Sequence, residues 1–329
     1  MQNRIKSYES GHISMKKGKL LAFLAVLSLS LAGCKLARLS VKEASSTISS
    51  IDQPIEESTQ NSSGDQPVEE SSQKEGHSSR EVIDENPQGL EFRLSDHGTY
   101  YVGQGSSASI SSVIIPATYK GIIVDGIFDN GFSGSAYTSI SIPDSVTTIG
   151  VWAFSDCTSL ESITIPGSVA SIDECAFCGC SSLSSITIPD GVTYIGDRAF
   201  GGCTSLASIS IPDGVTSIGE CVFLGCSSLT SIFIPGSVTS IGYETFRDCA
   251  SLSSVIIPGS VASIGDYAFY NCSSLAEVFY AGSAADWSSI TVGEGNDHLT
   301  SATRYFYSEE KPTESGNYWR YVDGVPTVW

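Results

Sequence analysis

Apolar residues recur along residues 142–279 with a period of 23 residues. Six units follow one another without a gap, and they start at Ile142, Ile165, Ile188, Ile211, Ile234 and Ile257. Within each unit the segment L-x-x-I-x-I-P alternates apolar and polar positions and ends in proline, which predicts one short strand. The segment A-F-x-x-C-x-x-L has apolar residues about three positions apart, which predicts a helical turn or a tight 3₁₀ arc.

A looser unit precedes these six. It starts at Ile115, carries about five extra residues around Tyr119–Gly121, and keeps Ile127, Phe132 and Ile140 in register. The fixed apolar positions form columns down the array, such as a Phe column (Phe154, Phe177, Phe200, Phe223, Phe246, Phe269) and a Leu column (Leu160, Leu183, Leu206, Leu229, Leu252, Leu275). One unit cannot bury such residues alone, whereas stacked units can. We therefore predict a repeat solenoid of the α+β or mainly β class, with a short parallel strand in each coil.

The cysteines follow the same period. Six of the ten form a column of their own, namely Cys157, Cys180, Cys203, Cys226, Cys249 and Cys272. Cysteine behaves there as a small buried hydrophobe, so we favour core packing, although coil spacing alone does not exclude disulfides. Cys175, Cys178 and Cys180 lie close enough in sequence for a metal or redox centre. A zinc site usually needs four ligands, however, and no histidine occurs between His97 and His298.

The N-terminus carries a targeting signal. Lys16, Lys17 and Lys19 precede an apolar run, Leu20–Leu31, which is too short to span a bilayer. The run ends in Leu31-Ala32-Gly33-Cys34, which resembles the lipobox of bacterial lipoproteins. That resemblance implies cleavage before Cys34 (signal peptide 1–33) and lipid on its sulfur. An ordinary signal peptide with an incidental cysteine is the alternative, and a true start at Met15 is left open.

The composition changes after the signal. Residues 35–88 hold 11 acidic and 5 basic residues among many serines, with only scattered apolar positions. Such a segment cannot bury enough apolar surface to offset chain entropy. We therefore expect residues 34–88 to form a disordered tether between the lipidated cysteine and the solenoid.

The repeats resemble the leucine-rich repeats of the BspA-like family, bacterial surface proteins whose units end in AFxxCxSL. The resemblance covers residues 115–279. LEFRLSDHGTYYV (90–102) and IPATYKGIIVDGI (115–127) resemble the family's N-terminal entry, and the segment YAGSAADW to RYFY (280–307) resembles its C-terminal cap. We expect an N-terminal cap at 89–114, leucine-rich repeats at 115–279 and a C-terminal cap at 280–309. The aromatic tail, 310–329, holds the hairpin signal Asp323-Gly324.

The outward positions of the strand segments supply the candidate binding residues. They are hydroxyl-rich over most of the array and turn apolar over the last three coils. Exposed apolar and aromatic patches often mark interfaces. The candidates are Thr164, Thr187, Ser210, Phe233, Ile256, Phe279 and Tyr280. An open alternative is that the C-terminal cap folds over Phe279 and Tyr280.

Charge and residue content exclude several functions. A net charge of −19 argues against nucleic acid as a partner and against electrostatic attachment to anionic lipid. The array holds 13 acidic residues and two arginines, which favours basic partners or weak cation binding. Asp144, Asp190 and Asp213 recur after the proline, but other units have glycine there. The array lacks histidine and G-x-S-x-G, and His97 and His298 fall in opposite caps, so we predict no catalytic residue, no cofactor and no metal site.

These observations predict a non-catalytic, lipid-anchored protein on the bacterial cell surface. The BspA-like resemblance implies an adhesin that contacts host matrix proteins or other cells through its strand face. The alternative is a structural scaffold or spacer of the cell envelope without a specific ligand, which the near-identity of the units favours somewhat. A third possibility is an envelope glycan bound by the C-terminal aromatic residues Tyr318, Trp319, Tyr321 and Trp329.

Overall fold

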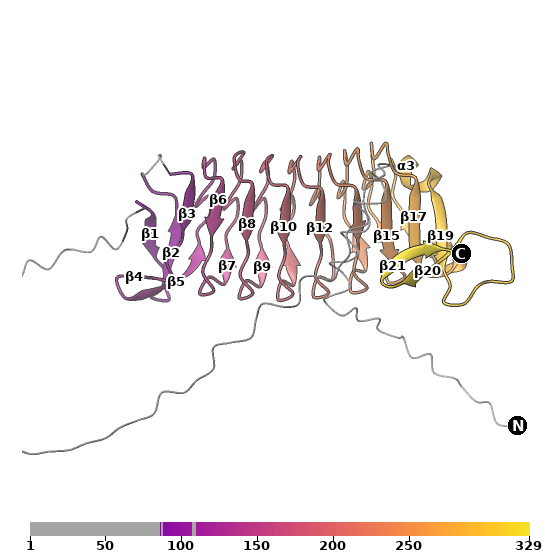
Figure 1. Ribbon diagram of the computed structural model, residues 1–329, viewed down its shortest axis with the longest axis horizontal. Coiled ribbons are helices and arrows are strands. Elements are labelled where there is room, and N and C mark those ends of the chain that lie inside the picture. The colour runs from indigo at the N-terminus through magenta and orange to yellow at the C-terminus, as the bar shows by residue number, and fades with distance from the viewer. Residues whose placement is uncertain (1–85, 87, 107–109) are drawn as a thin grey trace, which may run out of the picture. The chain divides into compact units, whose positions relative to one another are not determined.

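Stacked coils make up the part of the chain that the computed structural model describes, residues 86, 88–106 and 110–329 (Figure 1). The predicted signal peptide, Cys34 and the tether lie outside these residues, apart from Asn86 and Gln88. Each coil contains one 23-residue unit. Equivalent residues of successive units pair directly, as Ser139 does with Ser162 and Ser231 with Ser254. The described chain is therefore a solenoid, as the sequence predicts.

The predicted strand segment forms a parallel ladder along one side of the stack. Within the described residues its strands are β3 (Ser112–Ile114), β6 (Ser139–Ser141), β8 (Ser162–Thr164), β10 (Ser185–Thr187), β12 (Ser208–Ser210), β13 (Ser231–Phe233), β15 (Ser254–Pro258), β17 (Glu277–Ala281) and β19 (Thr303–Tyr307). The strands from β3 to β12 form one sheet and those from β13 onward another. The ladder thus extends one strand into each predicted cap.

A second parallel ladder runs along another side and was not predicted. Within the described residues its strands are β2 (Tyr100–Gly103), β5 (Ile122–Ile127), β7 (Thr148–Ile149), β9 (Ser171–Ile172), β11 (Tyr194–Ile195), β14 (Ser240–Ile241), β16 (Ser263–Ile264) and β18 (Thr291–Val292). Ile218 joins it through a single bridge to Ile241. The strands β7, β9, β11, β14 and β16 each bury one isoleucine of the V-x-x-I segment, and β18 has Val292 at the equivalent place. Two residues are too few to show an alternating pattern in the sequence, which is why the prediction missed this ladder.

The tight arc that the sequence predicts on the third side of each coil consists of turns, with hydrogen bonds such as the one from Cys178 N to Cys175 O at 3.1 Å. Residues with positive φ recur twice per coil, for example Arg198 (φ 56°) and Gly202 (φ 74°). Residues with left-handed backbone conformation alternate with stretches of right-handed conformation, and every second backbone N–H of the arc points toward the next coil. Phe177 N donates to Ala199 O at 2.8 Å and Gly179 N to Gly201 O at 2.7 Å, both in the next coil. A helix would have closed these bonds within one coil.

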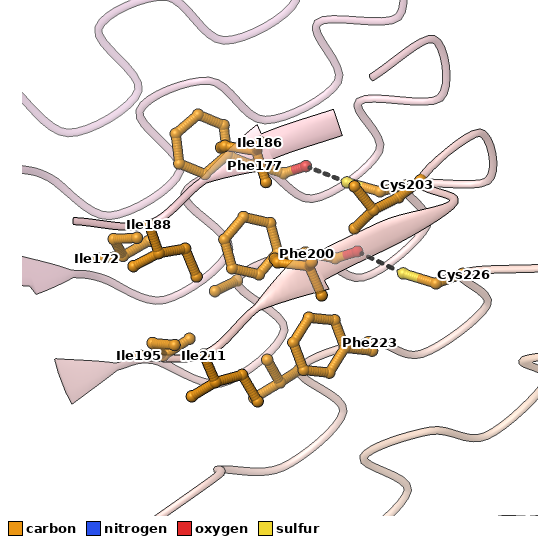
Figure 2. Close-up of a cluster of buried hydrophobic side chains, with 14 of the residues drawn as sticks. Ile172, Phe177, Ile186, Ile188, Ile195, Phe200, Cys203, Ile211, Phe223 and Cys226 are labelled. Carbon is orange, nitrogen blue, oxygen red and sulfur yellow. Dashed lines mark hydrogen bonds between the residues drawn. The ribbon is translucent and has the colours of Figure 1, made fainter. Parts of the chain in front are cut away.

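Stacked phenylalanine rings fill the core (Figure 2). Seven rings, from Phe132 to Phe269, lie parallel with 5.1–5.8 Å between successive centroids. The rings of the Phe column are fully buried, and the Leu and Cys columns are buried beside them. Burial of one such ring contributes about 3–5 kcal/mol by the cost of truncation to alanine. Repetition of that contribution stabilises the stack.

The cysteine column also satisfies backbone carbonyls. Each thiol donates to the phenylalanine carbonyl of the preceding coil, as Cys203 Sγ does to Phe177 O and Cys226 Sγ to Phe200 O, both at 3.2 Å (Figure 2). Phe177 O accepts a second bond, from Cys180 N of its own coil. The thiol therefore occupies the second lone pair of a buried carbonyl, a function that alanine or valine could not provide.

The N-terminal end is closed by antiparallel pairs. β1 (Glu91–Leu94) pairs with β2 (Tyr100–Gly103), which lies parallel to β5 (Ile122–Ile127). β4 (Thr118–Tyr119) pairs antiparallel with the start of β5. The extra residues of the looser unit thus leave the stack as a hairpin. Lys120 (φ 50°) and Gly121 (φ 74°) form its turn, the two-residue geometry that suits the strand twist.

The C-terminal end contains the two described helices, α2 (Ala284–Ser289) and α3 (Asp297–Ser301). Asn296, which is buried, replaces the missing next coil: its Oδ1 accepts from Phe269 N at 2.9 Å and its Nδ2 donates to Gly265 O. β20 (Tyr318–Val322) continues the first ladder and turns at Asp323-Gly324 into the antiparallel β21 (Val325–Val328). Polar side chains thus close the arc and a hairpin closes the strand side.

We expect Gly225→Ala to lower the free energy of unfolding by about 1 kcal/mol, because Gly225 has a φ of 71° with open space around it. The matched control is Gly236→Ala, which also enters open space but at ordinary φ, and it should leave stability unchanged or slightly raised. Chemical denaturation of the two variants measures the difference. Equal effects would show that the left-handed conformation is not what Gly225 provides.

Candidate functional site

The hydroxyl-rich strand face is exposed over the N-terminal half of the array. Thr164 and Thr187 are exposed and Ser210 is half-buried, each at the end of its strand. The buried isoleucine before each of them fixes the outward direction, because successive side chains of a strand point to opposite faces. Thr187 pairs with Thr164 on one side and with Ser210 on the other. The structure therefore brings these three candidates together in one row.

The apolar end of the strand face is not an open patch, and that interpretation of the sequence is wrong for three residues. Ile256 is 5% exposed, Phe279 8% and Tyr280 1%. Tyr305 of β19 stacks on Phe279 at 5.2 Å between centroids, and Trp319 of β20 meets it edge-on at 5.6 Å. Only Phe233 keeps part of its surface.

Tyr280 is buried for a different reason. It pairs in register with Ile257, the inward residue of the previous coil, so its side chain enters the core between Trp287 and Phe306. Its carbonyl accepts the indole N–H of Trp319 at 3.0 Å. The C-terminal residues therefore cover the outer side of Phe279 and pack against Tyr280 in the core. This is the alternative that the sequence left open, in which the cap folds over both residues.

The aromatic tail is used largely for this covering. Trp319 is fully buried, and burial raises the pKa of the Tyr321 hydroxyl, which lies against Trp319 and Tyr307. Trp329 donates through Nε1 to Ser308 O at 3.0 Å and lies under the Arg320 guanidinium at 3.9 Å. Tyr318 is half-buried. Because Trp319 and Tyr321 are occupied by packing, the tail does not present four free rings to a glycan.

The cysteine cluster does not converge on a common point. Cys180 directs its thiol to Phe154 O at 3.1 Å, Cys178 donates to Ser155 Oγ at 3.3 Å, and Cys175 is buried. All nine cysteines from Cys157 onward are free thiols. Burial raises the pKa of Cys203, Cys226 and Cys249, and it raises that of Cys272 to about 12. Burial, and then the neighbouring Cys178, raise the pKa of Cys175 to about 12.

The acidic and histidine candidates are likewise dispersed. Asp144, Asp190 and Asp213 are exposed on separate turns. Among the described residues no group of three or more His, Cys, Asp or Glu side chains is placed to hold a metal ion. His97 lies between β1 and β2, and His298 lies in α3 at the other end of the stack (Figure 1). The two histidines therefore do not share a site.

Sequence reasoning missed a group of exposed tyrosines on the arc of turns. Tyr243, Tyr267 and Tyr270 lie in contact there, two of them strongly exposed. The signal was available in the sequence. The position of Ser155, Cys178, Gly201, Leu224, Arg247 and Tyr270 holds a different residue in each of the six units, whereas the first outward strand position is serine in five of the six. This column was missed because the repeat is recognised from positions that hold the same residue in each unit, and this position is the most variable of the unit.

The stacked coils and their buried columns define a leucine-rich-repeat solenoid. A family model for the BspA type leucine rich repeat region matches residues 125–250 and 194–289, which together make up half of the chain. The chain belongs to this family. Its members are bacterial surface proteins, typically without enzymatic activity, which indicates a non-catalytic protein-binding role outside the cytoplasm. No curated protein matches the sequence.

Three solved structures are similar to this chain, and the first of them supports the fold. The leucine-rich repeat protein of T. pallidum is 27% identical with a TM-score of 0.54, over 57% of this chain and 89% of that one. A leucine rich cell surface protein of Faecalibacterium prausnitzii is 30% identical with a TM-score of 0.42, over 56% of this chain and 63% of that one. A leucine-rich repeat protein of Bacteroides ovatus is 27% identical with a TM-score of 0.39, over 66% and 70%.

None of the helices among the described residues has the length and apolar content that a membrane crossing requires.

We expect Cys178 to be the fast-reacting thiol among the nine cysteines from Cys157 onward, because it alone is partly exposed. Alkylation of the folded protein at about pH 8, followed by peptide mass spectrometry, should label Cys178 first. Cys178→Ser should abolish the fast phase, and denaturant should make all nine equally reactive. Rapid labelling of Cys203 or Cys226 in the folded chain would contradict the buried cysteine column.

Proposed function

We propose that this protein is a lipid-anchored adhesin of the bacterial cell surface, which binds a protein ligand of the host matrix or of another cell through its strand face. The observation that supports this most directly is the continuous row of outward hydroxyls from β6 to β12. Ser141, Thr164, Thr187 and Ser210 stand side by side on paired strands. Their backbone is fixed by the ladder, so a ligand would order few groups on binding.

The size of this face shows how far the contact must extend. Strands about 4.8 Å apart and about 10 Å long give a face of about 250 Å² from β3 to β13. An ordinary protein interface covers about 800 Å² of each partner, so a stable contact would also include the turns that flank the strands. Phe233 stands at its C-terminal edge, half-buried, and is the one remaining apolar anchor of the predicted set. We propose it as the apolar anchor at one end of the contact, with Thr164, Thr187 and Ser210 as the hydrogen-bonding residues beside it.

The domain boundaries belong to the same proposal. Residues 1–33 are cleaved as a signal peptide, Cys34 carries the lipid, and residues 34–88 hold the solenoid away from the membrane. The segments 89–114 and 280–309 act as caps around the repeats at 115–279, and 310–329 forms the tail. A membrane partner other than this lipid is not part of the proposal.

The strand face is tested by surface binding of the full-length mature protein to immobilised host matrix proteins. Thr187→Lys and Phe233→Ser should each weaken a saturable interaction at least about tenfold, because they place charge in the row and remove its apolar anchor. The matched control is Thr193→Lys, an exposed threonine away from the strand face. Equal binding by all variants would exclude this face, and no saturable binding to any matrix protein would favour the scaffold alternative.

The anchor is tested separately. Cys34→Ala should move the protein from the membrane fraction to the soluble extracytoplasmic fraction, because no lipid can then be attached at that sulfur. Cell fractionation and the mass of the N-terminal peptide measure the outcome. Membrane association that survives the substitution would show that another segment holds the protein.

A further inference from the structure

The six units differ most where the arc of turns faces solvent. One arc position holds Trp152, Cys175, Arg198, Cys221, Glu244 and Tyr267, and all six of these residues have positive φ between 52° and 59°. Residues of this kind rarely adopt that conformation, which costs roughly 1–2 kcal/mol each relative to the right-handed form. The backbone geometry repeats although the side chains do not. The arc is therefore a constant frame that holds variable side chains, of which Cys175, Cys221 and Glu244 are buried, whereas the strand face presents hydroxyls in each coil from β6 to β12.

Large side chains gather on the arc in the last two units, and we name this group the tyrosine patch: Tyr243, Tyr267 and Tyr270 with Glu244, Arg247 and Asp248. Tyr243 is 41% exposed and Tyr270 44%. Tyr267 lies between them and meets both rings edge-on, at 6.2 Å from Tyr243 and 5.7 Å from Tyr270. In the unit before, the corresponding arc positions hold Leu224 and Gly225, so the patch has a definite edge.

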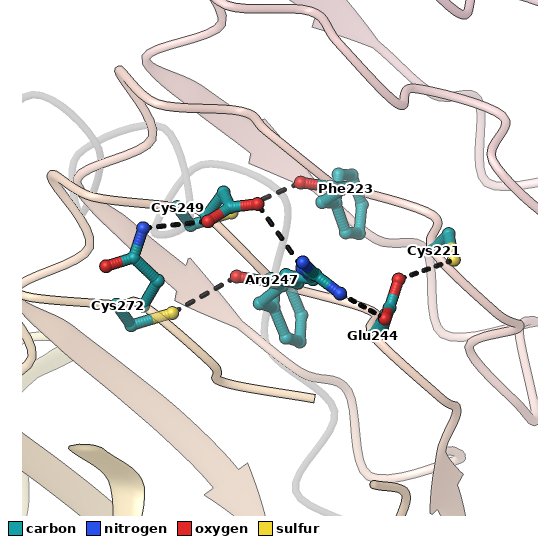
Figure 3. Close-up of polar contacts among 9 residues, drawn as sticks. Cys221, Phe223, Glu244, Arg247, Cys249 and Cys272 are labelled. Carbon is teal, nitrogen blue, oxygen red and sulfur yellow. Dashed lines mark hydrogen bonds and ion pairs between the residues drawn. The ribbon is translucent and has the colours of Figure 1, made fainter. Parts of the chain in front are cut away.

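Hydrogen bonds hold the patch in place (Figure 3). The Arg247 guanidinium donates to the Glu244 carboxylate and lies 3.4 Å from Asp248 Oδ2. Glu244 also accepts from the thiol of Cys221. Burial opposes ionisation of Glu244, but its hydrogen bonds from Tyr243 and Arg247 outweigh it and lower its pKa.

The margins of the patch are tied down in the same way. Asn271 Nδ2 donates to Asp248 Oδ1 at 2.8 Å, and the Tyr267 hydroxyl donates to Glu294 Oε1 at 3.0 Å. Rings fixed by such bonds lose little freedom when they are covered, which favours binding.

The charge around the rings selects the kind of partner. The carboxylates of Glu244, Asp248, Asp266 and Glu294 surround them, and Arg247 is the one basic side chain of the patch. Arg247 also shows how a cation is accommodated, because its guanidinium carbon lies over the Tyr270 ring at 5.2 Å from the centroid. A neutral sugar would need free hydrogen-bond acceptors, yet Glu244, Asp248 and Glu294 are already engaged.

We propose that the tyrosine patch is a second interaction surface, separate from the strand face, that binds a lysine- and arginine-rich segment of a partner protein by placing its cations over the exposed tyrosine rings within an acidic surround. Tyrosine and arginine are the residues that most often dominate binding energy at interfaces. The surface is formed by the arc and does not use Thr187 or Phe233.

The experiment measures binding of the full-length mature protein to a synthetic Arg-Gly repeat peptide and to the same peptide with glutamine in place of arginine. The Tyr243→Ala/Tyr270→Ala double variant should weaken binding of the arginine peptide about tenfold, since two cation–π contacts are lost. The Tyr243→Phe/Tyr270→Phe variant keeps the rings and should bind nearly as well. The matched control is Tyr194→Ala, a tyrosine 54% exposed in an earlier coil outside the patch, which should bind like the parent.

Three results would overturn the proposal. If the glutamine peptide binds as tightly as the arginine peptide, the charge of the peptide plays no part in the interaction. If added salt weakens binding of the arginine peptide but the Tyr243→Ala/Tyr270→Ala variant binds it like the parent, the interaction is a general attraction to an acidic chain. Binding of a neutral glycan panel that depends on Tyr243 and Tyr270, without peptide binding, would assign the patch to carbohydrate. Thr187→Lys and Phe233→Ser should leave peptide binding intact, so failure of the strand-face proposal and failure of this one are distinguishable.

Discussion

Contact between equivalent residues of neighbouring coils is the constraint on which this structure depends. Each phenylalanine ring stacks on the ring of the next coil, at 5.1–5.8 Å between centroids, and every second arc N–H donates to a carbonyl of the next coil. Neither contact exists within a single unit. A unit of this sequence therefore gains stability only when it has neighbours on both sides, and the two ends must be completed by other means. At the C-terminal end, the side chain of Asn296 accepts the hydrogen bond from Phe269 N that a further coil would have accepted, and the ring of Trp319 covers Phe279.

How far the sequence predicts this structure depends on whether a feature repeats. The Phe, Leu and Cys columns and the first strand ladder were predictable because each occurs once in every unit. The left-handed residues of the arc were not predicted, because positive φ cannot be anticipated at residues such as Trp152 or Arg198, whose intrinsic preference opposes it. Interactions between coils impose it. Phe279 and Tyr280 were misjudged for the opposite reason, since what covers them comes from β19 and β20, which lie outside the repeat and carry no periodic signal.

The two proposed binding surfaces differ because some positions pack against the next coil and others do not. A position that packs against its neighbours must hold the same residue in each coil, and the strand face inherits that uniformity because its short strands alternate with buried isoleucines. The outward arc positions are freer of this requirement, since the contacts that repeat in every coil there are made by the backbone. Variable chemistry can therefore accumulate on the arc without loss of the stack. This explains why the strand face offers an extended, repetitive surface and why the most individual group, around Arg247 and Tyr270, lies on the arc.

The strict register also determines how such a chain can change in length. Loss or gain of one residue inside a coil would displace every later contact of that coil from its ladder, and within a strand it would exchange the inward and outward faces. Duplication or loss of a whole unit leaves each ladder intact, because the new neighbours are equivalent to the old. The looser unit shows the other permitted route, in which surplus residues leave the stack as the hairpin at Lys120-Gly121. Variation in length is thus confined to whole coils and to excursions at their corners, so the reach of the molecule from its point of attachment can change in steps while its cross-section stays constant.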